Sequence, residues 1–232
     1  MPDRILETLT WQSVARMIDH TNLRPEATPD QIVRLCDEAR EFGFGAVMVN
    51  GCYVELAGKK LRGTDVKVGA VIGFPLGAVL TSVKTFEAAE ILRLGAREID
   101  MVINVGALKA GKREQVAADI RAVAEVVHEQ KALLKVILET VLLADEEKVA
   151  ACQISVDSGA DFVKTSTGFL GGGATVADIA LMRHAVGNKC GVKASGGVRT
   201  AANVKAMISA GANRIGTSNG VSIIRELQGE TK

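Results

Sequence analysis

The hydrophobic and polar positions of this chain follow two alternating patterns. Short apolar runs of strand length recur along it, and longer stretches with the apolar spacing of helices separate them. We predict strands over residues 17–21, 45–49, 66–72, 97–103, 133–139, 161–165, 191–195 and 213–217. We predict helices over residues 8–16, 29–41, 53–61, 80–94, 112–130, 145–158, 175–186, 200–210 and 219–227.

This alternation of strand and helix indicates a parallel sheet, because helical crossovers join parallel strands. Eight such units predict a single-domain α/β fold, a (β/α)8 TIM barrel over residues 1–232, with a short N-terminal helix before the first strand. A shared junction supports the repeat, since helical patterns end at Gly95, Gly159 and Gly211 shortly before a strand. An open doubly wound sheet remains the alternative, because several strand runs are short.

The alternation of side chains within the predicted strands places polar residues on one face. Ile99 and Met101 form an apolar face that suits the packing of helices, and Asp100 between them points to the other side. In a barrel the helices cover the outside, so the polar face lies inside. The residues predicted to share this interior are Asp100, Asn104, Lys135, Glu139, Lys164 and Lys193. Branched apolar residues would fill a purely structural interior, so the polar residues favour a functional site.

Lys164 ends a short apolar strand and precedes small hydroxyl residues. A second ammonium group nearby, that of Lys193, disfavours its protonation and leaves a neutral amine that can attack a carbonyl. Asp100 can balance charge and transfer protons. The plainer interpretations are an interior salt bridge between Lys193 and Asp100, and a simple pair between Lys135 and Glu139.

Three glycine-rich loops follow the last three predicted strands, and each precedes a helical pattern. Exposed backbone N–H groups and helix N-termini in such loops can hold a phosphate, most often after strands 7 and 8 of a barrel. The predicted phosphate-binding residues are Gly171, Gly172, Gly196, Gly197, Gly216, Ser218 and Asn219.

Composition narrows the possible partners. The net charge of +1 argues against a nucleic-acid surface, and no apolar stretch approaches the length that spans a membrane. Four scattered cysteines without paired spacing are typical of a cytoplasmic protein, and no apolar signal region follows Met1. The histidines and cysteines share no metal-ligand spacing, so we expect neither a metal nor another cofactor.

Six segments together resemble the deoxyribose-phosphate aldolase family. They are residues 18–23 (IDHTNL), 73–77 (GFPLG), 98–104 (EIDMVIN), 135–140 (KVILET), 162–169 (FVKTSTGF) and 192–199 (VKASGGVR). The resemblance covers nearly the whole chain, and its last two motifs are highly specific.

The resemblance implies a metal-free class I aldolase that reversibly cleaves 2-deoxy-D-ribose 5-phosphate into acetaldehyde and D-glyceraldehyde 3-phosphate. It implies that Lys164 forms the Schiff base, that Lys193 lowers the pKa of Lys164 and that Asp100 transfers protons. Asp19, Lys135, Glu139 and Thr165 are expected to form the supporting polar network. We also expect a homo-oligomer, a dimer or a tetramer.

The chain departs from familiar members of that family at three places. Met48 replaces a common cysteine, Asn219 replaces a serine, and Tyr53 is the only tyrosine, so we expect water to relay protons where a C-terminal tyrosine would. Two other function classes stay open. A phosphosugar isomerase or synthase would use carboxylates without a Schiff base, and a non-catalytic sugar-phosphate-binding barrel would keep its ligand without Lys164.

Overall fold

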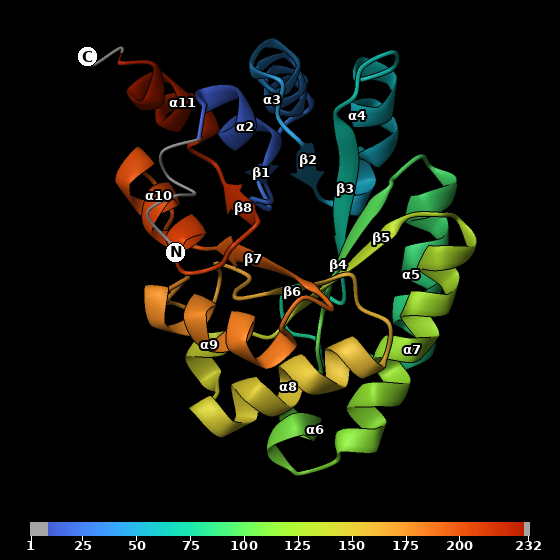
Figure 1. The fold of residues 1–232 in the computed structure, drawn as a ribbon. Helices are drawn as coiled ribbons and strands as arrows, with labels where there is room; N and C mark the ends of the chain where they lie inside the picture. Colours follow the sequence, from blue (N-terminus) through green and yellow to red (C-terminus); the bar gives the residue numbers. More distant parts are fainter. Residues whose placement is uncertain (1–8, 230–232) are drawn as a thin grey trace.

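A computed structural model describes residues 9–229 of the chain, and these residues form a closed barrel of eight parallel strands (Figure 1). The strands are β1 (Ile18–Asn22), β2 (Ala46–Val49), β3 (Lys67–Ile72), β4 (Glu98–Val102), β5 (Leu133–Ile137), β6 (Phe162–Lys164), β7 (Gly191–Ser195) and β8 (Arg214–Thr217). Strand β1 pairs with β8 as well as with β2, and Asp19 lies opposite Gly216. This closure confirms the TIM barrel and excludes the open doubly wound sheet.

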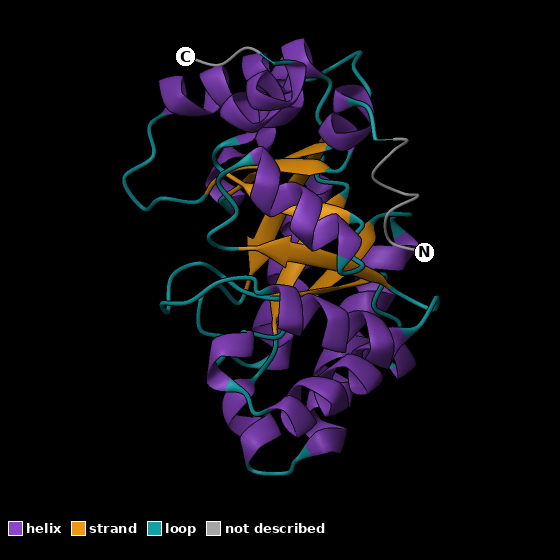
Figure 2. Ribbon diagram, turned by 60° about the vertical axis from the view of Figure 1, so that its left-hand side comes forward, coloured by secondary structure: helices purple, strands orange, loops and turns teal. Residues whose placement is uncertain are grey.

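Helices connect the strands and surround them, so the strands lie inside the molecule (Figure 2). The α-helices are α2 (Trp11–Arg16), α3 (Pro29–Phe42), α4 (Val54–Lys60), α5 (Thr81–Arg93), α6 (Val105–Lys109), α7 (Arg113–Glu129), α8 (Asp145–Asp157), α9 (Val176–Val186), α10 (Ala201–Ser209) and α11 (Gly220–Gln228). Within residues 9–229, no helix combines the length and the apolar character that crossing a membrane needs.

Local sequence signals explain several helix starts. Thr28 caps α3 by accepting a hydrogen bond from the Gln31 N–H, and the Gln31 side chain accepts one from the Thr28 N–H, which completes a capping box. Thr175 caps α9 in the same way by accepting from the Asp178 N–H at 3.0 Å. The predicted helices over residues 29–41 and 175–186 thus begin at, or one residue before, the helix starts in the structure.

The structure differs from the prediction at three connections. A short helix, α6, follows β4, and 3-10 helices η1 (Gly51–Tyr53) and η2 (Thr140–Leu142) precede α4 and α8. The predicted strands 97–103 and 133–139 are too long, because β4 and β5 end at Val102 and Ile137. The predicted helix over residues 8–16 begins at Trp11, and residue 8 lies outside the described residues.

The register of the strands brings the polar interior positions together. Asp100 of β4 lies opposite Lys135 of β5, and Lys164 of β6 lies opposite Lys193 of β7. Ile99 and Met101 belong to the buried apolar layer, as the alternation of side chains predicted. The barrel therefore places four ionisable side chains from four consecutive strands in one interior.

Candidate active site

Lys164 lies at the end of β6, where the residue is 3% exposed. Its Nζ contacts Asp100 Oδ2 at 2.8 Å. A cavity of about 650 Å³ opens beside Lys164, and its lining also includes Thr167, Ser195 and Gly216. Among the described residues, Lys164 is thus the only lysine that lines this cavity. A small molecule in the cavity can reach its amine.

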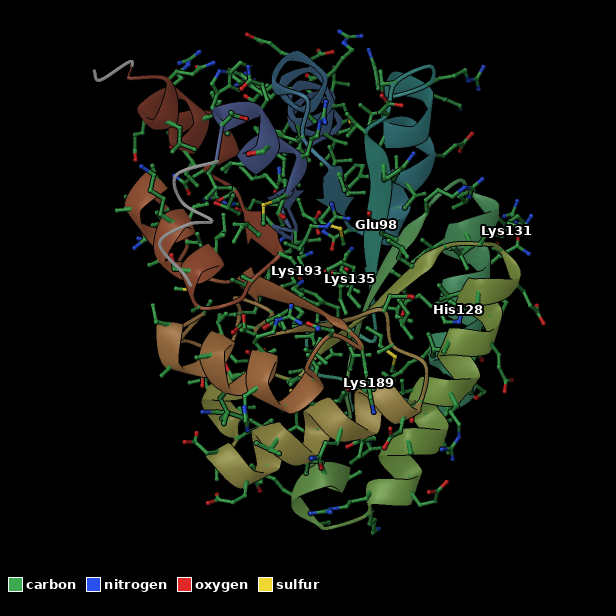
Figure 3. The ribbon with its side chains drawn as sticks, in the orientation of Figure 1. Glu98, His128, Lys131, Lys135, Lys189 and Lys193 are labelled. Carbon is green, nitrogen blue, oxygen red and sulfur yellow. The ribbon has the colours of Figure 1, made fainter. Side chains whose placement is uncertain are left out.

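Asp100 is the centre of the ionic cluster. Its Oδ2 accepts hydrogen bonds from Lys164 and Lys193, each at 2.8 Å, and its Oδ1 accepts one from Lys135 at 3.0 Å. Figure 3 shows Lys193 and Lys135 extending into the barrel interior. Lys193 also donates to Asp19. The structure therefore brings together Lys164, Lys193, Asp100, Asp19 and Lys135, as the sequence predicted.

Two further charged residues extend the cluster, and the sequence analysis missed both. Glu98 contacts Lys135 at 2.5 Å through one oxygen and Arg214 at 2.5 Å through the other. Arg214 Nε also lies 3.3 Å from Asp19. The signal for Glu98 was present, because Glu98 lies two positions before Asp100 and so shares its face of the strand. Arg214 could have been found in the same way, two positions before Gly216.

The charges of this buried cluster balance when Lys164 is neutral. Asp19, Glu98 and Asp100 then face the three cations of Lys135, Lys193 and Arg214. A protonated Lys164 would add a fourth cation to a buried site, which is unfavourable. Charge balance thus favours the form of the amine that attacks carbonyl groups.

The pKa values agree with this description. Burial lowers the pKa of the Lys164 ammonium to about 8, with the cations of Lys193 and Lys135 assisting and Asp100 opposing. Burial would by itself raise the pKa of Asp100, but Lys135, Lys164 and Lys193 hold it well below its usual range. In the same way Lys193, Lys135 and Arg214 outweigh burial and lower the pKa of Asp19 to about 2. In the resting site both aspartates are carboxylates, so Asp100 accepts a proton before it can donate one.

The structure corrects the expected placement of two residues. Asn104 lies beyond the end of β4, where its Oδ1 accepts from the Ala107 N–H at 2.9 Å and caps α6, so it does not join the lysine cluster. Glu139 does not pair with Lys135, because it follows the end of β5 in a left-handed conformation (φ 59°). Its carboxylate accepts hydrogen bonds from the Thr167 N–H and hydroxyl instead.

Thr165 and His20 make contacts outside the charged cluster. The Thr165 hydroxyl donates to the Ser195 carbonyl at 2.9 Å and accepts from the Ser195 N–H at 3.0 Å, which links β6 to the end of β7. The Nε2 of His20, in the IDHTNL segment, lies 2.7 Å from Glu38 of α3. Thr165 therefore holds the ends of β6 and β7 together, and His20 connects β1 to α3.

The glycine loops after β7 and β8 lie along the cavity beside Lys164. Gly196, Gly197, Gly216, Ser218 and Asn219 all line the cavity that contains Lys164. Gly171 and Gly172 lie outside this lining. Their loop packs instead against the loop after β7, where the Ala174 N–H donates to the Gly196 carbonyl at 3.0 Å.

Three arginines that the sequence analysis did not single out complete the cavity wall. They are Arg24, Arg34 and Arg199. Arg24 lies 4.0 Å from Glu26 in an exposed pair, which contributes little. Arg34 and Arg199 form no salt bridge with any described residue. Guanidinium groups suit phosphate oxygens, so this wall favours an anionic ligand.

The structure shows the surroundings of Met48 and Tyr53, two of the residues at which the sequence departs from familiar members of the family. Met48 is buried beside Leu23 and Val71, with Phe74 packed against them, so a thioether occupies the position of the expected cysteine. Tyr53 donates its hydroxyl proton to the Ala27 carbonyl and takes no part in the lysine cluster.

Comparison with known proteins settles the family. The model of the DeoC/LacD family aldolases matches residues 13–227. The chain belongs to this aldolase family. A deoxyribose-phosphate aldolase of Geobacillus sp. (strain WCH70) is 58% identical over 212 residues, which are 91% of this chain and 95% of the relative. A deoxyribose-phosphate aldolase of Thermococcus gammatolerans is 57% identical over 218 residues, 93% of this chain and 97% of the relative.

A solved structure agrees with the fold of this DeoC/LacD family aldolase. The deoxyribose-phosphate aldolase from Aeropyrum pernix, described as a unique tetrameric structure, superimposes with a TM-score of 0.92 at 31% identity. The alignment covers 99% of this chain and 97% of that structure. Within residues 9–229, no three His, Cys, Asp or Glu side chains are arranged to hold a metal ion.

Proposed function

We propose that this protein is a class I aldolase that reversibly cleaves 2-deoxy-D-ribose 5-phosphate into D-glyceraldehyde 3-phosphate and acetaldehyde. The observation that carries the proposal is the Lys164 amine, which has a pKa of about 8 and lies beside a cavity whose wall suits a phosphate. An isomerase or synthase that relies on carboxylates alone would have no use for this amine. A purely binding barrel would not require its lowered pKa.

The first half of the reaction forms a covalent intermediate. Neutral Lys164 attacks the C1 aldehyde of the open-chain sugar, and loss of water from the carbinolamine gives an iminium ion. Asp100, an ionised carboxylate 2.8 Å from the Lys164 Nζ, accepts the proton that the attacking nitrogen releases. Lys193, bonded to the same carboxylate oxygen, keeps positive charge beside Asp100 and limits its basicity.

The second half breaks the carbon–carbon bond. The C3 hydroxyl loses its proton, the C2–C3 bond breaks and its electron pair moves into the enamine, which releases D-glyceraldehyde 3-phosphate. Protonation of the enamine at C2 restores an iminium ion, and hydrolysis frees acetaldehyde and Lys164. We assign the proton transfers to Asp100 acting through water, since it is the one carboxylate of the cluster bonded to Lys164.

The phosphate end of the substrate is assigned to the loops after β7 and β8. Ser218 and Asn219 precede α11 (Gly220–Gln228), so N–H groups at the start of this helix favour an anion. The Asn219 N–H already donates to the Thr217 hydroxyl at 2.9 Å, which fixes the loop. Gly196, Gly197 and Gly216 let backbone groups approach the phosphate closely.

A charge placed in this loop tests the phosphate assignment. Ser218→Asp should raise the KM for 2-deoxyribose 5-phosphate on the order of 10- to 100-fold, because a carboxylate then faces the phosphate. The efficiency with unphosphorylated 2-deoxyribose, already low, should change by less than about threefold. Gln153→Asp adds the same charge on the exposed side of α8, outside the cavity lining, and serves as the control. Equal losses with both sugars would place the phosphate elsewhere.

Chelation tests the proposed independence from metals. After exhaustive treatment with EDTA, the release of acetaldehyde from 2-deoxyribose 5-phosphate should proceed at the untreated rate, because an iminium ion supplies the electron sink. An activity lost to EDTA and restored by zinc would instead indicate a metal-dependent aldolase.

We also propose that the protein forms a homo-oligomer and acts in the cytoplasm. The related Aeropyrum pernix aldolase is described as tetrameric, which supports an assembly of identical chains. All four cysteines are unpaired thiols, as expected for a reducing compartment.

A further inference from the structure

The interior of the barrel is divided into a polar part, the ionic cluster, and an apolar part. On β2 and β3, Val49 and Ile72 belong to the main core between the strands and the helices. Side chains alternate along a strand, so Met48 and Val71, which precede them, face the interior. These two residues form a separate buried cluster with Leu23, which follows β1.

Two further apolar side chains continue this part of the interior along β4 and β5. Val102 and Ile137 are 1% and 0% exposed. They directly follow Met101 and Val136, which belong to the main core, so they too face the interior. The five interior residues, here called the apolar wall, are Leu23, Met48, Val71, Val102 and Ile137.

The apolar wall lies beside the reacting amine. Ile137 lies opposite Lys164 in the pairing of β5 with β6. Val71 lies opposite Asp100 in the pairing of β3 with β4, and Asp100 Oδ2 is 2.8 Å from the Lys164 Nζ. Leu23 lines the same cavity as Lys164. A carbonyl compound bound to Lys164 therefore has the apolar wall on the side of β2 to β5 and the phosphate loops on the side of β7 and β8.

The apolar wall is closely packed. Met48 occupies the space that a Cβ atom on Gly69 would need. Phe74 packs against the wall, and its ring centroid lies 5.2 Å from that of Phe169, which lines the cavity. Four of the five side chains are hydrocarbons, and the Met48 thioether is only a weak acceptor. A hydroxyl group pressed against this wall would lose water without gaining a hydrogen-bond partner, which is unfavourable.

We propose that the apolar wall makes this aldolase select sugars that carry no hydroxyl group at C2. C2 is bonded to the carbon that Lys164 attacks, so its substituents lie between the ionic cluster and the wall. A C2 hydroxyl that turned to Asp100 would compete with the three lysines already bonded to that carboxylate. A C2 hydroxyl that turned the other way would meet the wall. The proposal rests on the proposed function and names residues that set its preference for a 2-deoxy sugar.

The efficiencies of cleavage of 2-deoxyribose 5-phosphate and ribose 5-phosphate test this proposal. Cleavage of ribose 5-phosphate yields glycolaldehyde in place of acetaldehyde, and both sugars release D-glyceraldehyde 3-phosphate, so one assay follows both. An apolar pocket discriminates against an added hydroxyl by roughly 100-fold, so the wild-type protein should favour the deoxy sugar by about that factor in kcat/KM.

Two substitutions in the apolar wall should weaken this preference. Val71→Thr keeps nearly the shape of valine and adds a hydroxyl group, so it should lower the ratio of the two efficiencies on the order of 10-fold, the effect of one hydrogen bond. Leu23→Asn adds an amide where the wall lines the cavity and should act in the same direction. It decides the question if Val71→Thr does not fold.

A matched control and a fluorinated sugar separate polarity from other effects. Val49→Thr makes the same change at a buried position that faces the helices, and it should leave the ratio unchanged. In 2-deoxy-2-fluororibose 5-phosphate, fluorine replaces the C2 hydroxyl without donating a hydrogen bond. Its efficiency relative to the deoxy sugar should be the same in the wild type and in Val71→Thr.

Borohydride trapping makes the same comparison without carbon–carbon bond cleavage. With equal concentrations of acetaldehyde and glycolaldehyde, the share of the glycolaldehyde adduct on Lys164 should be larger in Val71→Thr than in the wild type. A wild type that cleaves both sugars equally well overturns the proposal. So do folded Val71→Thr and Leu23→Asn variants with the wild-type ratio, or a Val49→Thr variant that lowers it as much. A changed adduct share in a protein that cleaves neither sugar would contradict the proposed function alone.

Discussion

Replacing Lys164 is expected to abolish turnover and covalent capture together. In Lys164→Ala and Lys164→Arg, the rate of deoxyribose 5-phosphate cleavage should fall on the order of 10⁴-fold or more, because the nucleophile that forms the iminium ion is missing. Borohydride with acetaldehyde or the sugar phosphate should trap an adduct on wild-type Lys164, located by peptide mapping, and none on the variants.

The arginine variant separates charge from nucleophilicity. Lys164→Arg places a permanent cation beside Asp100, whereas Lys164→Ala removes the amine without adding charge. A loss of activity common to both variants therefore comes from the missing nucleophile and not from the charge of the ionic cluster. Lys189→Ala removes an exposed lysine and should change neither the rate nor the site of the adduct. An adduct found only on Lys193 would show that the wrong lysine has been assigned as the nucleophile.

Replacing Lys193 is expected to move the pH dependence of the reaction. In Lys193→Leu, the acidic limb of the rate profile should shift to higher pH. The lost cation no longer repels the Lys164 ammonium, and Asp100 and Asp19 lose a partner that offset their attraction for it. The pKa of Lys164 should rise from about 8 toward the roughly 10.4 of a free lysine.

The size of the loss follows from the fraction of neutral amine. At pH 7 the activity should fall about 10- to 100-fold, and raising the pH to about 9 or 10 should recover part of it. Lys193→Arg retains a cation, so its acidic limb should stay near the wild-type position. Removing Lys193 leaves Asp19 and Asp100 with fewer buried partners, so the free energy of unfolding should fall by about 3–5 kcal/mol. A near-UV circular dichroism spectrum therefore serves to verify that the variant is folded.

The opposite results would reassign Lys193. A limb that moves to lower pH would mean that the cation had not been lowering the pKa of Lys164. Complete inactivity without recovery at high pH, in a folded variant, would give Lys193 a direct part in breaking the carbon–carbon bond.

The strand and helix pattern of the sequence was enough to predict the barrel and much of the cluster. Side chains alternate along a strand, so an outer apolar face of Ile99 and Met101 places Asp100 inside. Applied to β4 through β7, this rule brought Asp100, Lys135, Lys164 and Lys193 together, and the register of the barrel confirms their proximity.

The same rule failed where a strand ended sooner than its apolar pattern. Asn104 and Glu139 belong to the interior only if β4 and β5 continue through them. The chain leaves the sheet before both, and each side chain accepts a hydrogen bond from a backbone N–H group of the following loop or helix, that of Ala107 or Thr167. Apolar residues continue past a strand end because the loop there is also buried, so the pattern does not mark where the strand stops.

The sequence by itself determined which residue types face the interior and which loops carry glycines. Only the tertiary structure decided the partners within that interior: that Asp100 bonds three lysines, that Glu98 and Arg214 complete the charge balance, and that His20 pairs with Glu38. The physical reason is that alternation is a property of one strand, whereas a salt bridge depends on the register between strands and on the closure of the barrel. Contacts such as Lys193 to Asp19, which are 174 residues apart, exist only after β8 has paired with β1.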